Sequence, residues 1–287
     1  MSRKESLLIG RTSVAKRIEH AEAQVIAMAS APARQRDGSG FATPLCGGIA
    51  CFAGAASPMN KVAGLGFGGT PESAVMDDIE NEFAIRGLPT QVELSSLADP
   101  EIGAMLAQRG YRLVSFENVL GRRLGPDLQP ATPPGIEVDL CGADDFDAWV
   151  RAVVDGSVHP DDDGVPFYEQ FSAEVIEREE RDFQNAGATM YVGRCEGVVA
   201  AGASMVFTDG VAQFTGAATA PAYRRRGLQT ALLARRLADA AAGGCDVAVI
   251  TTAPGSKSQE NAQRRGFHLL YTRAVLVKAV EGADMSV

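Results

Sequence analysis

The stretch PAYRRRGLQTALLARRL, from Pro221 to Leu237, decides how this chain of 287 residues folds. It places three arginines and a glycine where a long amphipathic helix begins, and Leu233, Leu237 and Ala240 recur at helical spacing. The first N–H groups of a helix have no intrahelical acceptor, and the helix dipole makes that end partly positive. We therefore predict a helix that packs on a sheet and begins with a loop suited to a phosphate group.

The segments on both sides of this stretch support the prediction. Val211–Thr215 alternates as a strand does and precedes the loop, and the β-branched run Val247–Thr251 follows the helix, which ends at Gly243-Gly244. A solvated basic helix start is the alternative interpretation. The order of strand, loop, helix and strand favours the phosphate-binding interpretation.

The six residues from Arg224 to Gln229 resemble the R/Q-x-x-G-x-G/A loop that binds the pyrophosphate of coenzyme A in the GNAT superfamily of acyl-CoA-dependent N-acyltransferases. Gln229 departs from that pattern, so its side chain must point away from the phosphates or contact them itself. Ser258–Phe267 is similar to the family's last helix and its Gly-Phe ending. The elements predicted from Ile136 onward also follow the order of a GNAT domain: strand 136–140, helices 144–155 and 168–185, and strands 189–194 and 198–207.

The resemblance implies acetyl-CoA as the cosubstrate and direct transfer of its acetyl group to an amine. In this family pantetheine lies in the gap between two parting strands, which would place its amides at Ala217, Ala218 and Thr219, with N–H groups near Thr219 stabilising the oxyanion. Asn261 on the last helix is a further candidate contact, and a helix-surface or capping role is its alternative. The implied acyl-CoA-binding residues are Ala217, Ala218, Thr219, Arg224, Arg225, Arg226, Gly227, Leu228, Gln229, Thr230 and Asn261.

The residue that protonates the leaving thiolate is not at its usual place. The family commonly has a tyrosine four residues before the glycine of Gly-Phe, and this chain has Ala262 there. Tyr271, just past Gly266-Phe267, is the candidate substitute, and a half-buried strand aromatic is the alternative. A thiol with a pKa near 8.5 can also leave as thiolate at a cost of about 2 kcal/mol at pH 7.

The general base is not at its usual place either. The strand that often carries a carboxylate in the family has Gln213 and Thr215, which cannot accept a proton. His159 is the candidate base, since histidine is the residue type suited to proton transfer near neutral pH and this one lies in the loop 157–164, a region that usually lines the acceptor pocket in proteins of this kind. Its neighbours Asp161, Asp162 and Asp163 could attract a cation. A solvated turn with a helix-capping aspartate is the alternative.

A repeat divides the chain into two halves. Gln108–Leu120 can be laid on Arg264–Leu276 without a gap, which aligns Gly110 with Gly266, and each copy follows a predicted strand and a short helix. The breaker-rich segment 125–135 reads as a linker. The predicted fold class is α+β, with two tandem GNAT-like domains at 1–125 and 136–287 joined by 126–135, each a mixed, mostly antiparallel sheet flanked by helices.

The first half has a different glycine-rich segment at the equivalent place. Gly64–Gly69 reads GxGxxG after a strand and before a helix, which is the pattern of a dinucleotide-binding loop in a Rossmann-type protein. The helix that follows is acidic in its first turns, with Glu72, Asp77, Asp78, Glu80 and Glu82, and these charges would compete with a pyrophosphate. We therefore predict that the first half, which begins with an amphipathic helix over 11–29, is a degenerate GNAT-like domain without a coenzyme site.

Composition narrows the function further. The net charge of −9 would repel nucleic acid, and no apolar run approaches the roughly 20 residues that span a bilayer. The five scattered cysteines indicate neither a disulfide framework nor a zinc site, and the N-terminus does not read as a secretory signal, so a cytoplasmic protein without a metal is expected. The predicted function is N-acetylation of a small-molecule or peptide amine, and the alternative is a non-catalytic acyl-CoA-binding sensor or partner-binding module.

Overall fold

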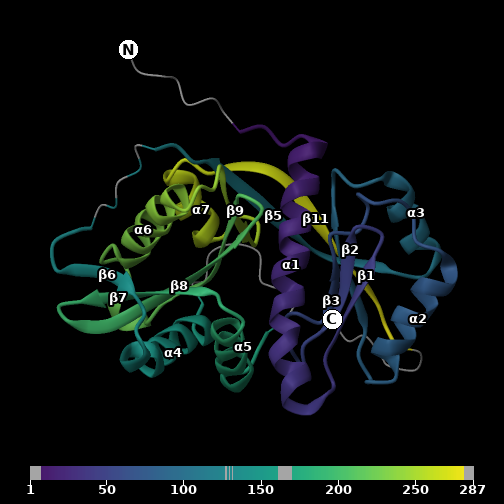
Figure 1. Ribbon diagram of the computed structural model, residues 1–287, viewed down its shortest axis with the longest axis horizontal. Coiled ribbons are helices and arrows are strands. Elements are labelled where there is room, and N and C mark those ends of the chain that lie inside the picture. Colours follow the sequence, from purple (N-terminus) through teal and green to yellow (C-terminus); the bar gives the residue numbers. More distant parts are fainter. Residues whose placement is uncertain (1–7, 127, 129, 131, 161–169, 281–287) are drawn as a thin grey trace. The chain divides into compact units, whose positions relative to one another are not determined.

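The computed structural model describes residues 8–126, 128, 130, 132–160 and 170–280 (Figure 1). The chain forms two compact units. The C-terminal unit contains Val119–Leu269, and the N-terminal unit contains Gly10–Asn118 together with the segment from Leu270 onward. This division differs from the two contiguous domains predicted from the sequence, because the last strand of the chain packs with the first half.

The C-terminal unit is built on a mixed sheet. Its strand order is β6-β7-β8-β9-β10, with the end of β5 beside β10. Strands β6 to β9 pair antiparallel, and β9 and β10 pair parallel. Its elements are β6 (Ile136–Leu140), α4 (Ala143–Val158), α5 (Ala173–Asn185), β7 (Thr189–Cys195), β8 (Val198–Thr208), β9 (Val211–Thr219), the 3-10 turn η1 (Pro221–Tyr223), α6 (Leu228–Ala242), β10 (Val247–Thr252) and α7 (Lys257–Arg264).

Helices cover both faces of this sheet, as Figure 1 shows. A methyl group added to Gly193 would lie 3.2 Å from Leu228 of α6, whereas one added to Gly202 would lie 2.4 Å from Trp149 of α4. Glycine therefore lets each helix approach the sheet closely at these two points. The apolar stripe predicted for α6 is confirmed, because Leu232, Leu233, Leu237 and Ala240 are buried in the core of this unit.

The N-terminal unit contains strands of mixed direction in the order β1-β2-β3-β4-β11-β5, which belong to the same continuous sheet. Alternate residues of β2 face different layers: Ile49 and Cys51 join a cluster with α1, and Ala50 joins the cluster that contains α2 and α3. Its elements are α1 (Thr12–Asp37), β1 (Phe41–Leu45), β2 (Gly48–Phe52), β3 (Lys61–Ala63), α2 (Ser73–Ala84), β4 (Thr90–Ser95), α3 (Pro100–Gln108), most of β5 (Arg112–Arg123) and most of β11 (His268–Lys278).

The predicted repeat is confirmed in its local geometry. Gly110 and Gly266 both have positive φ, 86° and 79°. The N–H groups of Tyr111 and Phe267 donate to Leu106 O at 3.0 Å and to Ala262 O at 3.1 Å, at the same spacing in the two copies. Each copy thus ends a short helix, turns on glycine and enters a long strand.

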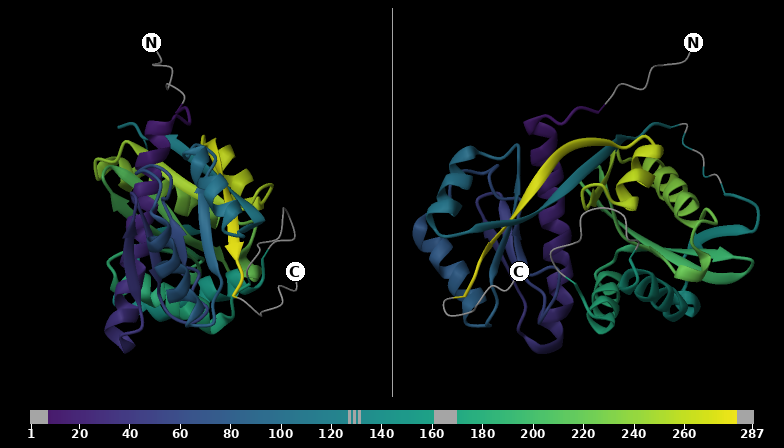
Figure 2. Two further views of the ribbon diagram at one scale, coloured as in Figure 1. Left: turned by 90° about the vertical axis from the view of Figure 1, so that its right-hand side faces the viewer. Right: turned by 180° about the vertical axis from the view of Figure 1, so that it is seen from behind.

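The two long strands of the repeat, β5 and β11, lie side by side (Figure 2). β11 pairs antiparallel with β4, from Arg273 opposite Ser95 to Lys278 opposite Thr90. β5 ends beside β10, and Leu124 N–H donates to Asp246 O at 2.9 Å. The last strand of the chain therefore joins the strands of the N-terminal unit.

The glycines of Gly64–Gly69 serve turns and close packing. Gly64, Gly66 and Gly69 have φ values of 73°, 99° and 97°, which glycine adopts without strain. A methyl group on Gly66 would lie 2.5 Å from Ala98 Cβ, and one on Gly68 would lie 2.3 Å from Cys46 O. The segment is thus packed against its own unit.

Candidate functional site

The predicted phosphate-binding segment (Arg224–Thr230, called the phosphate loop) consists of the loop Arg224–Gly227 and the first three residues of α6. Gly227 is the N-cap residue of α6 with φ 96°, and Arg225 has φ 62°, which is uncommon for a residue with a side chain. The first intrahelical bond runs from Ala231 N–H to Gly227 O at 3.0 Å. The helix therefore offers no acceptor to the N–H groups of Leu228, Gln229 and Thr230, which are the groups that would hold a phosphate.

The three arginines of the phosphate loop have different surroundings. The Arg224 guanidinium donates to Gly156 O at 3.0 Å and also to the carbonyl oxygen of His159, so it ties the loop to the end of α4. The Arg226 guanidinium lies over the Tyr223 ring, 5.4 Å from its centre. Arg225 and Arg226 are exposed, so they remain available to a phosphate, whereas Arg224 contributes chiefly to the shape of the loop.

Gln229, the residue that departs from the family pattern, does not block the loop. Its Nε2 donates to Thr219 Oγ1 at 2.9 Å. The side chain therefore lies along the end of β9 and links the start of α6 to Thr219. This contact settles the choice left open by the sequence: the side chain of Gln229 points to the strand.

Strands β9 and β10 part just before the phosphate loop. Their parallel pairing joins Val211–Gln213 with Val247–Val249, and β9 continues for six more residues to Thr219. The predicted pantetheine contacts lie on this continuation, where Ala217 is exposed and Ala218 and Thr219 are buried. The hydroxyl of Thr252, at the end of β10, is buried and has no hydrogen-bond partner in the described part of the chain. An extended amide chain between the strands would provide such a partner.

The last helix, α7, holds Asn261 half-buried and Ala262 in the hydrophobic core. Ala262 is 1% exposed and packs in the cluster that contains Phe267. The position where the family commonly has a tyrosine is therefore filled by core packing.

A β-bulge in β9 lies beside the open strand edge. The pairing of β8 with β9 shifts register between Gly202 and Ser204, where Gly202 is opposite Ala218 and Ser204 is opposite Thr215. Gly216, in this bulge, has φ 50°. The hydroxyl groups of Ser204 and Thr215 are 2.8 Å apart.

Two charged side chains reach this bulge from different helices. Arg236 of α6 is buried and donates to Ser204 O at 3.1 Å and to Thr215 O at 3.4 Å, and burial lowers its pKa to about 10. Glu180 of α5 lies so close that a methyl group on Gly216 would be 2.8 Å from its Oε1 and 3.0 Å from its Oε2. Burial raises the pKa of Glu180 to about 8, and the neighbouring charge of Glu179 adds to the shift.

Sequence reasoning missed Glu180, although a signal was present. Ile176, Glu180 and Phe183 follow one another at the spacing of a single helix face, and Phe183 is buried. A carboxylate in the middle of an apolar stripe indicates a buried charge. Arg236 gave a similar signal in α6, where buried Leu232, Leu233 and Leu237 surround it.

His159 is placed at the exposed C-terminal end of α4. Its Nδ1 lies 2.9 Å from Asp155 O and 3.3 Å from Asp155 Oδ1, and its backbone oxygen accepts from Arg224. Asp161, Asp162 and Asp163, predicted with it, lie outside the described residues. The described contacts of His159 are those of a helix end.

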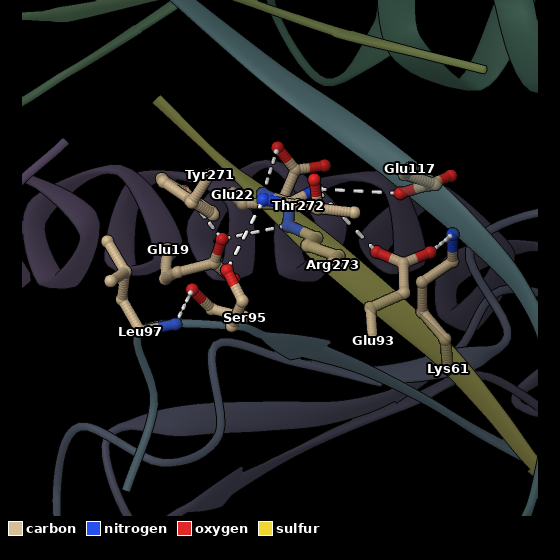
Figure 3. Close-up of polar contacts among 11 residues, drawn as sticks. Glu19, Glu22, Lys61, Glu93, Ser95, Leu97, Glu117, Tyr271, Thr272 and Arg273 are labelled. Carbon is tan, nitrogen blue, oxygen red and sulfur yellow. Dashed lines mark hydrogen bonds and ion pairs between the residues drawn. The ribbon is translucent and has the colours of Figure 1, made fainter. Parts of the chain in front are cut away.

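Tyr271 belongs to the N-terminal unit, in a buried polar cluster that Figure 3 shows. Its hydroxyl donates to Glu19 Oε1 at 2.7 Å. Burial and the nearby charge of Glu19 raise the pKa of Tyr271 far above its usual range. These contacts give Tyr271 a place in the polar core of that unit, whereas the phosphate loop belongs to the C-terminal unit.

Arg273 is the centre of this cluster, and its side chain is 1% exposed. Its guanidinium Nε lies 2.8 Å from Glu19 Oε1, and its terminal nitrogens lie 3.4 Å from Glu22 and 3.8 Å from both Glu93 and Glu117. Lys61 forms an ion pair with Glu93. Arg273 of β11 thus connects carboxylates from α1, β4 and β5 (Figure 3). Because the buried guanidinium and the carboxylates offset one another's charge, the cluster holds β11 beside these elements.

The comparisons with known proteins agree with this geometry. Residues 158–267 match the model of the acetyltransferase (GNAT) family. The chain therefore contains a GNAT-family domain, the class of domain that carries out acyl transfer, and the phosphate loop and parting strands lie within it.

Solved structures extend the likeness over both units. A GCN5-related N-acetyltransferase from Kribbella flavida is 22% identical, with a TM-score of 0.66 over 95% of this chain and 97% of its own. One from Sphaerobacter thermophilus is 17% identical, with a TM-score of 0.55 over 79% and 74%. A tandem GNAT protein from the clavulanic acid biosynthesis pathway is 13% identical, with a TM-score of 0.58 over 83% and 79%. No match was found among curated proteins. The predicted α+β fold with tandem GNAT-like domains is confirmed.

The described residues also show whether a metal site or a membrane-spanning helix is present. Within the described ranges, no group of three or more His, Cys, Asp or Glu side chains is arranged to hold a metal ion. No helix in the same ranges is long and apolar enough to cross a bilayer.

Proposed function

We propose that this protein transfers the acetyl group of acetyl-CoA to the amine of a small molecule or peptide. The observation that carries the proposal is the parting of β9 from β10 immediately before the phosphate loop. An extended pantetheine chain fits an open strand edge, because its amides can pair with the backbone as a further strand does. A pyrophosphate fits the first turn of α6, where N–H groups and the helix dipole favour an anion.

The residues near this edge suit direct transfer. The acyl carbonyl carbon of the thioester would lie beside the bulge of β9, where backbone N–H groups near Thr219 can stabilise the developing negative charge on its oxygen. Gln229 holds the Thr219 hydroxyl at 2.9 Å and so fixes this part of the strand. Because the amine attacks the thioester itself, the reaction needs no covalent intermediate on the protein.

Calorimetric titration with acetyl-CoA tests the binding step. We expect one site per chain, lost in Gly227→Val, because a branched side chain there would meet Pro133 at 2.9 Å and cannot adopt the φ of 96° without strain. Gly244→Val is the matched control, since Gly244 follows the other end of α6 with φ 81° and has open space around it. Equal binding by the two variants would contradict the proposed phosphate site.

Thiol release from acetyl-CoA tests the transfer step. The assay uses the full chain and a panel of amines that contains n-butylamine, putrescine, spermidine, an aminoglycoside and a short peptide. Stimulation by any of them supports the acetyltransferase. Tight binding of acetyl-CoA without stimulation by any amine would instead favour the non-catalytic acyl-CoA sensor.

A further inference from the structure

The carboxyl group of Glu180 is buried and not fully hydrogen-bonded. Glu180 is 9% exposed, and its Oε2 is fully buried with no hydrogen-bond partner among the residues that the structure describes. A buried carboxyl oxygen without a hydrogen bond lowers stability, and ionising the group there lowers it further. An acid kept at such a place indicates a function rather than a contribution to stability.

The position of Glu180 connects it to the proposed acyl-CoA site. Its two carboxyl oxygens would lie 2.8 and 3.0 Å from a methyl group on Gly216, three residues beyond the last pair of β9 with β10 at Gln213. Glycine at 216 is thus what leaves room for the carboxyl group against the strand. Glu180 stands on α5, whereas the phosphate loop leads into α6, and these two helices cover opposite faces of the sheet (Figure 1).

The electrostatic surroundings favour a cation at this point. Two effects raise the pKa of Glu180. The larger is burial in an apolar environment, and the smaller is the charge of the neighbouring Glu179. Glu179 is itself buried and lies 3.6 Å from Arg178. Asp182, on the same helix, is also buried. The adjacent acidic group of Glu179 and the burial of Glu180 thus make a bound ammonium group favourable once Glu180 is ionised.

We propose that Glu180 is the base that deprotonates the ammonium group of the acceptor. This inference rests on the proposed acetyl-CoA-dependent function and adds the catalytic residue. The carboxylate supplies charge for binding and then takes the proton, so one group serves both recognition and catalysis.

The chemistry balances without any further reactant. One proton passes from the ammonium nitrogen to the Glu180 carboxylate, which frees a lone pair. The nitrogen then forms a bond to the thioester carbonyl carbon, and the bond from that carbon to sulfur breaks. Coenzyme A leaves as the thiolate, and the second proton lost by the nitrogen passes to the thiolate. Glu180 returns its proton to solvent.

The test compares Glu180→Gln with Glu174→Gln, an exposed acidic residue on the same helix. Thiol release is measured from pH 6 to 9.5 with n-butylamine, putrescine and spermidine, and acetyl-CoA binding is measured by calorimetry. For E180Q we expect a fall in kcat of about 10²–10⁴-fold, loss of the rise in rate with pH, and an acetyl-CoA Kd within about threefold of wild type. Glu180→Asp should recover part of the rate. E174Q should match wild type in every measurement.

A binding measurement separates the two proposals. Butyltrimethylammonium carries the charge but cannot be acetylated. At about pH 9, above the pKa of about 8 at which Glu180 ionises, we expect wild type with bound coenzyme A to bind it at least tenfold more tightly than E180Q does. Normal kcat, the same pH profile and the same binding in E180Q would overturn the assignment of Glu180 and leave the acetyltransferase intact. Binding that depends on Glu180 without turnover of any amine would support ammonium recognition and overturn the acetyltransferase. Wild type that neither binds nor acetylates these probes would overturn both.

Discussion

Replacing Glu180 with glutamine should make the protein more resistant to unfolding in alkaline solution, even though it removes the proposed base. Burial raises the pKa of this carboxyl group to about 8, from an ordinary value of 4.5. Between these two pH values the folded protein keeps the proton on Glu180, and the unfolded chain releases it. The unfolded state then binds fewer protons, so the stability of wild type falls as pH rises from 4.5 to 8. Glutamine does not titrate, so the stability of E180Q should not fall with pH for this reason.

The magnitude follows from the same shift. One pKa unit corresponds to about 1.4 kcal/mol, so the shift of Glu180 costs wild type about 3 kcal/mol between pH 5.5 and pH 8.5. Urea unfolding of wild type and E180Q at these two pH values gives the difference directly, because the other titrating groups cancel between the two proteins. E174Q is the control and should follow wild type. The same pH dependence in wild type and E180Q would refute the claim that Glu180 is held in an apolar site.

Three further predictions concern the bulge of β9, the phosphate loop and the pairing of β5 and β11 with their neighbouring strands. Gly216→Ala should lower kcat at least tenfold with little change in acetyl-CoA binding, because the added methyl group would displace the Glu180 carboxyl. Gly197→Ala, at an open position with φ 80°, is the control for backbone strain. Equal kcat values for the two variants would contradict a catalytic role of the Glu180 carboxyl group at this position. Arg225→Ala should weaken acetyl-CoA binding by about 1–3 kcal/mol in calorimetry, and by less at high salt; an unchanged Kd would mean that the backbone alone holds the phosphates. A shortened chain that begins at Pro134 should aggregate in light-scattering measurements, because β10 loses its neighbour β5 and β11 loses its partner β4. A soluble, fully active monomer would show that these two pairings are dispensable.

The sequence by itself determined the features that depend on neighbouring residues. The phosphate loop could be predicted because Gly227 and the apolar stripe of α6 form one local pattern of turn and helix. The repeat could be predicted for the same reason, since Gly110 and Gly266 end their helices with hydrogen bonds that span only a few residues. Helix and turn geometry is a short-range property, so it can be read from residue order.

Only the tertiary structure decided which strands pair and which side chains become buried together. The repeat identified β5 and β11 as strands, but the pairing of β11 with β4 joins segments far apart in the chain and depends on the Arg273 cluster, whose carboxylates are distant in sequence. The proposed base could not be assigned for the same reason: Glu180 stands on a helix rich in charged residues, and its meeting with Gly216 is made by packing of α5 on the sheet. A pKa depends on burial and nearby charge, and both are set by contacts that residue order does not contain.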